Sequence, residues 1–164
     1  MPRTLVIGFG NIDRADDGAA FTVINTLRRR LGRPPLGEGE TGWEETGGDL
    51  DTVFLHQLTP ETAEYLVAYR RIVFVDAHVL ENAPEIHTFP VTPDFEPAAF
   101  THHLTPAMML GLLKALYGAE PEGRVVSIRG YDFDFRRGLS PRTGELAAEA
   151  AELILGLVEN PVQG

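Results

Sequence analysis

The sequence predicts an α/β fold: a three-layer sandwich with a twisted, mostly parallel sheet of about five strands and helices on both faces. Two observations lead to this prediction. Short apolar runs of strand length alternate along the chain with stretches in which apolar residues recur at helical spacing. Such apolar runs are typical of parallel strands that are buried on both faces of a sheet. With 164 residues, the chain has the length of one domain, 1–164, with a sizeable core.

The first predicted strand, residues 5–7, runs directly into the turn Gly8-Phe9-Gly10. Glycines allow the backbone to turn sharply and to come close to another group. Apolar residues at helical spacing then predict a helix, which Gly32 and the prolines at 34–35 end. Three arginines, 28–30, fall in its last turn, where positive charge suits the helix dipole. We expect this arginine cluster to be a solvated helix end.

The middle of the chain contains a loop, a helix and three further strands. Residues 36–49 are rich in Gly and Glu without periodicity, which predicts a loop. A short strand at 53–55 precedes Thr59-Pro60-Glu61, in which a cap, a first-turn proline and an acid open a helix. Residues 72–75 form the clearest buried strand and end at Asp76. Residues 86–89 predict a strand that the following proline favours at a sheet edge.

A proline-rich connection, 91–103, leads to a second Leu-Thr-Pro opening at 104–106. The helix that follows is expected to bury an apolar stripe made of Met108, Met109, Leu112, Leu113 and Leu116. Residues 125–128 predict the last strand, and a final helix begins at about residue 142. Strands and helices therefore alternate along the whole chain.

Composition excludes several classes of function. The net charge of −10 leaves no basic surface for phosphates, which argues against nucleic-acid binding. The chain has no cysteine, so disulfides, thiolate metal sites and cysteine nucleophiles are excluded. No apolar run approaches the length of a membrane span, and the N-terminus reads as a strand rather than a signal peptide. We expect a cytoplasmic monomer without membrane or nucleic-acid partners.

Known motifs exclude further chemistries. The third glycine of a dinucleotide-binding fingerprint would fall on Asp13, and an acid there opposes a pyrophosphate. The chain has no His-Glu-x-x-His pattern, and neither Ser127 nor Ser140 lies in Gly-x-Ser-x-Gly. A metal-assisted mechanism remains, in which the metal polarises a carbonyl or activates water.

The candidate site consists of acids and histidines at the carboxyl ends of predicted strands. Asp16 and Asp17 fall where the first helix begins, and either a helix-dipole role or a ligand role fits them locally. Asp76 closes the central strand, and His102 precedes the helix that opens at residue 104. If the fold brings these segments to one edge, Asp17, Asp76 and His102 form an open carboxylate–imidazole site suited to a divalent transition metal.

Three blocks contain the candidate residues: Val6-Ile7-Gly8-Phe9-Gly10-Asn11 with Asp16-Asp17-Gly18, then Ile72-Val73-Phe74-Val75-Asp76-Ala77, and His102-His103-Leu104-Thr105-Pro106. Together they resemble the hydrogenase maturation proteases, the endopeptidases that trim the C-terminus of the nickel–iron hydrogenase large subunit. The resemblance covers nearly the whole chain. One difference is Phe54-Leu55-His56-Gln57-Leu58-Thr59-Pro60, where the family often has a Gly-Gly-Thr-like loop.

The resemblance implies that Asp17, Asp76 and His102 contact the metal and carry catalysis. His103 is the alternative ligand, because the doubled histidine leaves the register open by one residue. The implied function is a nickel-directed endopeptidase that removes the C-terminal extension of a nickel–iron hydrogenase large-subunit precursor, with the nickel supplied within that precursor. One alternative is a non-catalytic metal-sensing or assembly-chaperone module for the same partner. Another is an unrelated metal-dependent hydrolase of small substrates.

Overall fold

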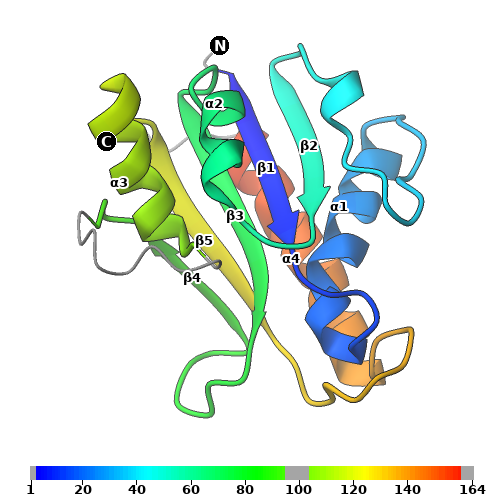
Figure 1. Ribbon diagram of the computed structural model, residues 1–164. Helices are drawn as coiled ribbons and strands as arrows, with labels where there is room; N and C mark the ends of the chain where they lie inside the picture. The colour runs from blue at the N-terminus through cyan, green and yellow to red at the C-terminus, as the bar shows by residue number, and fades with distance from the viewer. Residues whose placement is uncertain (1–2, 95–103, 160–164) are drawn as a thin grey trace.

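The described residues form a five-stranded sheet covered by helices on both faces, as the sequence predicts (Figure 1). The structure, a computed structural model, describes residues 3–94 and 104–159. The strands are β1 (Thr4–Phe9), β2 (Leu50–Leu55), β3 (Arg71–His78), β4 (Ile86–Pro90) and β5 (Glu122–Arg129). The α-helices are α1 (Ala19–Arg30), α2 (Ala63–Leu66), α3 (Pro106–Tyr117) and α4 (Pro141–Glu159). Short 3₁₀ helices are η1 (Ala15–Gly18), η2 (Trp43–Glu45) and η3 (Pro60–Thr62).

The strand order β2-β1-β3-β5-β4 brings the ends of β1, β2 and β3 together. β1 pairs in parallel with β2 and with β3, and β3 pairs in parallel with β5. β4 lies at one edge and runs antiparallel to β5, which agrees with the edge position expected from Pro90. The segments that follow β1, β2 and β3 therefore leave the sheet at the same edge, where open α/β sheets form their sites.

Side chains that alternate along the strands divide the interior into two cores. Val73 and Val75 of β3 pack with α1 and α4 on one face, whereas Ile72 and Phe74 pack with α2 and α3 on the other. Figure 1 shows these helix pairs on opposite sides of the sheet. The strand period of two places Asp76 on the same face as Phe74, the face that α2 and α3 cover. The side on which this carboxylate lies is thus set by the register of β3.

Arg28 corrects the expectation of a solvated arginine cluster at the end of α1. Its side chain is only 1% exposed, whereas Arg29 and Arg30 are exposed. The Arg28 guanidinium donates to the Pro34 carbonyl oxygen at 2.7 Å and pairs with Glu45. A buried guanidinium requires such partners, and here they come from Pro34 just after the first helix and from Glu45 in the predicted loop 36–49.

Three smaller expectations also change. β3 continues to His78 rather than ending at Asp76. Leu116 is 64% exposed and does not belong to the buried stripe of α3. Thr105 caps α3 by accepting a hydrogen bond from the Met108 amide at 3.1 Å, but Thr59 makes no such cap. Among the residues that the structure describes, no helix is long and apolar enough to cross a membrane.

Candidate active site at the carboxyl edge of the sheet

The turn after β1 holds Asp17 at the edge of the sheet. Gly10 has φ +152°, and a Cβ at this position would lie 2.1 Å from the Asp17 carbonyl oxygen, so the turn requires glycine. The Asn11 amide donates to Asp17 Oδ2 at 2.8 Å, and the Asp17 amide donates to the Arg14 carbonyl oxygen at 3.0 Å. The glycine turn therefore positions a carboxylate, which is the role the sequence favoured over a phosphate-binding loop.

The neighbouring Asp16 points into the protein interior and has a structural role. Its carboxylate is fully buried and accepts hydrogen bonds from the amides of Tyr131, Asp132 and Ser140. The hydroxyls of Ser140 and Thr143 also donate to it, at 2.7 and 2.9 Å. Burial by itself would raise the pKa of Asp16, but these hydrogen bonds outweigh burial and lower it. Asp16 thus fastens η1 to the segment between β5 and α4.

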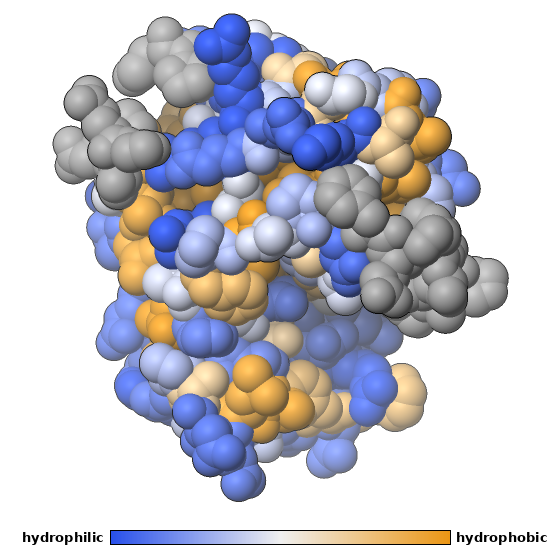
Figure 2. Space-filling model, turned by 90° about the vertical axis from the view of Figure 1, so that its left-hand side faces the viewer, coloured by the Kyte–Doolittle hydropathy of each residue, from blue (hydrophilic) through white to orange (hydrophobic). Residues whose placement is uncertain are grey.

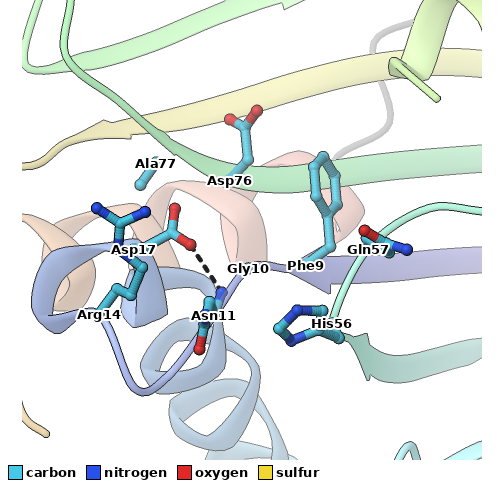
Figure 3. Close-up of a pocket in the computed structure, with 9 residues that line it drawn as sticks. All are labelled: Phe9, Gly10, Asn11, Arg14, Asp17, His56, Gln57, Asp76 and Ala77. Carbon is cyan, nitrogen blue, oxygen red and sulfur yellow. Dashed lines mark hydrogen bonds between the residues drawn. The ribbon is translucent and has the colours of Figure 1, made fainter. Parts of the chain in front are cut away.

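Asp17 and Asp76 line one cavity, whose volume is about 310 Å³ (Figure 3). The cavity lies beyond the ends of β1 and β2 and beside the end of β3. In Figure 3 the Asp17 side chain, from η1, lies beside the Asn11 turn, whereas the Asp76 carboxylate points toward β5. The other residues of the lining are Phe9, Gly10, Asn11, Arg14, His56, Gln57 and Ala77.

The burial of the Asp76 carboxylate is only partly compensated by hydrogen bonds. Its Oδ1 atom is buried and has no hydrogen-bond partner among the residues that the structure describes. Burial raises its pKa to about 6, a hydrogen bond with Ser127 opposes this rise, and the nearby negative charge of Asp17 adds to it. A cation placed between the two acids would relieve both the missing contact and the repulsion, because carboxylate oxygens are ordinary ligands of divalent metals. The two residues therefore fit a cation that approaches from the cavity.

The histidine part of the predicted site is not described. His102 and its alternative, His103, lie outside the described residues, so their position relative to the two acids stays a prediction. Within residues 3–94 and 104–159, no group of three or more His, Asp or Glu side chains is arranged to hold a metal ion. The structure thus brings Asp17 and Asp76 to one cavity, and their catalytic and ligand roles remain predictions.

Two polar residues of the cavity follow β2 and were not singled out as site residues from the sequence. His56 and Gln57 line the cavity from the segment that directly follows β2. Their position after a parallel strand was a usable signal, since β2 ends at the same edge as β1 and β3. Arg14 brings a positive charge to the rim, where its side chain also donates to the Phe133 carbonyl oxygen at 3.2 Å.

Comparisons with solved structures identify the fold. A [NiFe] hydrogenase maturation protease, HycI from Thermococcus kodakarensis, matches with a TM-score of 0.68 and 19% identity, covering 97% of this chain and 94% of that one. The hydrogenase maturating endopeptidase HybD from E. coli matches with a TM-score of 0.68 and 21% identity, covering 98% and 95%. A hydrogenase 2 maturation peptidase from a Thaumarchaeota archaeon matches with a TM-score of 0.62 and 18% identity, covering 95% and 97%.

No sequence-family description matches the chain, and neither does any curated protein sequence. The structural matches extend over almost the whole length of both partners, so the chain has the fold of the [NiFe] hydrogenase maturation proteases. The likeness that the three sequence blocks indicated is confirmed at the level of the fold. At these identities, what the site does has to be argued from its own residues.

Proposed function

We propose that this protein is an endopeptidase of hydrogenase maturation. Its substrate would be the large-subunit precursor of a nickel–iron hydrogenase, from which it removes the C-terminal extension after nickel has been inserted. One observation carries the proposal: on the fold of the maturation proteases, Asp17 and Asp76 line one cavity at the carboxyl edge of the sheet, and Asp76 has a buried oxygen without a partner in the described part of the chain. The named activities of the structural neighbours support the same reaction class.

In this proposal, nickel arrives as part of the substrate. Asp17 and Asp76 bind it through carboxylate oxygens, and His102 or His103 is the third candidate ligand. Binding would fix the precursor so that its scissile peptide bond lies beside the two acids, and such positioning lowers the entropic part of a reaction barrier. A bound metal of this kind can polarise the peptide carbonyl or activate water. The Asn11 amide keeps the Asp17 carboxylate oriented for the task.

The direct test is processing of the precursor encoded in the same genome. Purified protein mixed with nickel-loaded precursor is expected to shorten that precursor, as measured by intact mass, and nickel-free precursor should stay intact. Asp17→Asn and Asp76→Asn are expected to slow processing by about 100-fold or more, because each removes a charge aimed at the metal. Asp13→Asn is the matched control, since Asp13 is a nearby exposed acid that pairs with Arg137 and does not line the cavity.

Two results would contradict the proposal. If the wild-type protein binds nickel-loaded precursor tightly and never shortens it, the protein is a metal-sensing or assembly module instead of a protease. If Asp17→Asn and Asp76→Asn process the precursor as fast as wild type, these residues are not part of the machinery. The cytoplasmic location and monomeric state expected from the sequence stay predictions that fractionation and size measurement can check.

A further inference from the structure

A second cavity, of about 330 Å³, adjoins the first at Asp76. Asp76 lines both cavities, so a residue that would bind the metal also forms part of the wall of the second cavity. The second cavity is enclosed by β3, β4, β5 and the beginning of α3, on the face of the sheet that α3 covers. Figure 2 views the side of the molecule on which α3 and β4 lie in Figure 1, and shows hydrophobic and hydrophilic residues around a hollow in this face.

The floor of the second cavity is a polar row that crosses three strands. Asp76 of β3 is paired with Ser127 of β5, and Ser127 is paired with His87 of β4. Residues opposite one another in a sheet share a face, and so do residues two apart on one strand. His78 therefore joins the same face, about 7 Å further along β3. All four residues line the cavity.

His78 Nε2 is a buried nitrogen to which no hydrogen-bond partner is assigned within the described residues. The Leu80 amide donates to His78 Nδ1 at 3.2 Å, so in the neutral ring the proton is on Nε2. Carbonyl groups of Pro84 and Glu85 lie near the ring, but Nε2 is buried and makes no hydrogen bond in the part of the chain that the structure describes. Asp76 Oδ1 and His78 Nε2 are thus two polar atoms on one face of one strand that find no partner within residues 3–94 and 104–159. Buried polar atoms usually have partners, so this pair calls for a ligand.

The rest of the lining selects an apolar occupant. Carbon-rich walls come from three sides of the cavity: Leu80 and Phe89 near β4, Pro106 and Ala107 on α3, and Val125 on β5. An acidic side chain would lose its hydration among these groups without gaining a partner, whereas a basic one would meet only the Asp76 carboxylate, which the proposed function assigns to the metal. An acidic one would also meet Asp76 in a chain whose net charge is −10. The volume suits a single residue rather than a folded segment.

We propose that this second cavity is a specificity subsite that binds one apolar side chain of the substrate tail, next to the scissile peptide bond. His78 Nε2–H donates to a backbone carbonyl of the same extended segment and thereby positions it. The inference rests on the proposed function, because the shared residue Asp76 connects this subsite to the site that would hold the scissile bond. It assigns His78 a positioning role, since the imidazole contacts the substrate away from the bond that breaks.

The first experiment measures cleavage preference. Two nickel-loaded precursors are compared that carry Leu or Gly at one residue flanking the scissile bond, with each side tested in turn. On one of the two sides, wild type is expected to favour Leu by about 10-fold or more in kcat/KM, the scale that a few buried methylene groups provide. Ala107→Trp, which fills the cavity from α3, should abolish this preference. Leu116→Trp is the matched control on the same helix, because Leu116 is 64% exposed and lies outside the cavity.

His78→Leu separates the donor from the bulk of the side chain. Loss of the hydrogen bond is expected to raise KM about 10-fold while kcat stays close to wild type, because the contact is present before and during the reaction. Equal kcat and KM values in His78→Leu and wild type would remove His78 from the proposal. No Leu preference on either side of the bond, or an unchanged preference in a folded Ala107→Trp variant, would remove the subsite.

A binding experiment keeps the inference testable if cleavage itself fails. Protein with ¹⁵N-labelled histidine is titrated with acetyl-Gly-Leu-Gly-amide and, separately, with acetyl-Gly-Asp-Gly-amide. The Leu peptide is expected to shift the His78 Nε2 resonance in wild type and in Leu116→Trp, but not in Ala107→Trp, and the Asp peptide should shift none of them. Absence of the shift, or an equal shift with both peptides, overturns the subsite. A wild-type protein that shows the shift but never cuts contradicts only the protease function.

Discussion

Asp16 and Asp76 are acids at the same edge of the sheet, but the protein surrounds them in opposite ways. Asp16 receives five hydrogen bonds from the segment between β5 and α4 and from the start of α4, and its pKa is lowered. Asp76 keeps one buried oxygen that no described residue contacts through a hydrogen bond, and burial raises its pKa to about 6. The fold supplies hydrogen-bond donors to the Asp16 carboxylate, whereas the Asp76 carboxylate lacks a donor for one of its oxygens among the described residues.

The difference separates an acid that holds the structure from an acid that is available to a ligand. Hydrogen bonds to a buried carboxylate stabilise the folded state, whereas a buried carboxylate without them destabilises it. Perturbed acids of the second kind gather at functional sites. The comparison therefore supports Asp76, with the adjacent Asp17, as the working pair, and assigns Asp16 to keeping Asp17 in place.

The largest expected change in stability comes from replacing Asp16. Asp16→Ala leaves several buried donors without an acceptor, so we expect the free energy of unfolding at pH 7 to fall by about 3–5 kcal/mol. Urea denaturation followed by circular dichroism measures this change. Asp13→Ala, which removes an exposed acid from the same turn, should cost less than about 1 kcal/mol. Similar costs for the two variants would break the comparison, because Asp16 would then be no more structural than a surface acid.

Replacing Asp76 is expected to raise the free energy of unfolding rather than lower it. Asp76→Asn should stabilise the metal-free protein at pH 8 by about 1–3 kcal/mol, since a rise of roughly two pKa units corresponds to at most ~3 kcal/mol. The same variant is expected to lose processing activity, so stability and function change in opposite directions. Unfolding of the chelator-treated protein at pH 8 measures the first effect. A marked loss of stability would show that the Asp76 charge is well satisfied and that the contrast with Asp16 is wrong.

The pH dependence sharpens the comparison further. Because the folded-state pKa of Asp76 is raised to about 6, its unfavourable contribution is absent below its ordinary value, grows up to pH 6 and is complete above that. The advantage of Asp76→Asn should thus vanish near pH 4. The folded-state pKa of Asp16 is lowered, so its stabilising contribution is complete above the ordinary value and is lost as pH falls through the lower folded value. The stability difference from wild type should therefore change with pH in opposite directions for Asp76→Asn and Asp16→Ala. Differences that change in the same direction would contradict this assignment.

The two Leu-Thr-Pro segments also contain similar residues of which only one makes the expected hydrogen bond, and the energies involved are smaller. Thr105 accepts a hydrogen bond from the Met108 amide, whereas Thr59 does not cap η3. Thr105→Ala is expected to cost about 1 kcal/mol in unfolding free energy, and Thr59→Ala less than about 0.5 kcal/mol. Thermal unfolding of both variants under identical conditions checks the difference. Equal losses would mean that sequence motif alone, and not the observed hydrogen bond, sets the stabilisation.

Much of the fold could be predicted because its signals are local. Apolar runs at 5–7 and 72–75 locate the central strands, and the glycine turn with Asp17 locates the edge where the site forms. The edge position of β4 also follows from one proline. By contrast, local sequence left the roles of Asp16 and Asp17 open, since the amide partners of Asp16 lie 115 or more residues away.

The sequence by itself determined the alternation of strands and helices, the placement of acids at strand ends and the classes of chemistry that are excluded. The tertiary structure alone decided which acid is satisfied, that Arg28 is buried, and that His56 and His78 face cavities beside Asp76. The physical reason is the distance along the chain between the interacting residues. Periodicity and capping depend on residues a few positions apart, whereas burial and hydrogen-bond partners depend on segments that meet only when the sheet and its helices pack together.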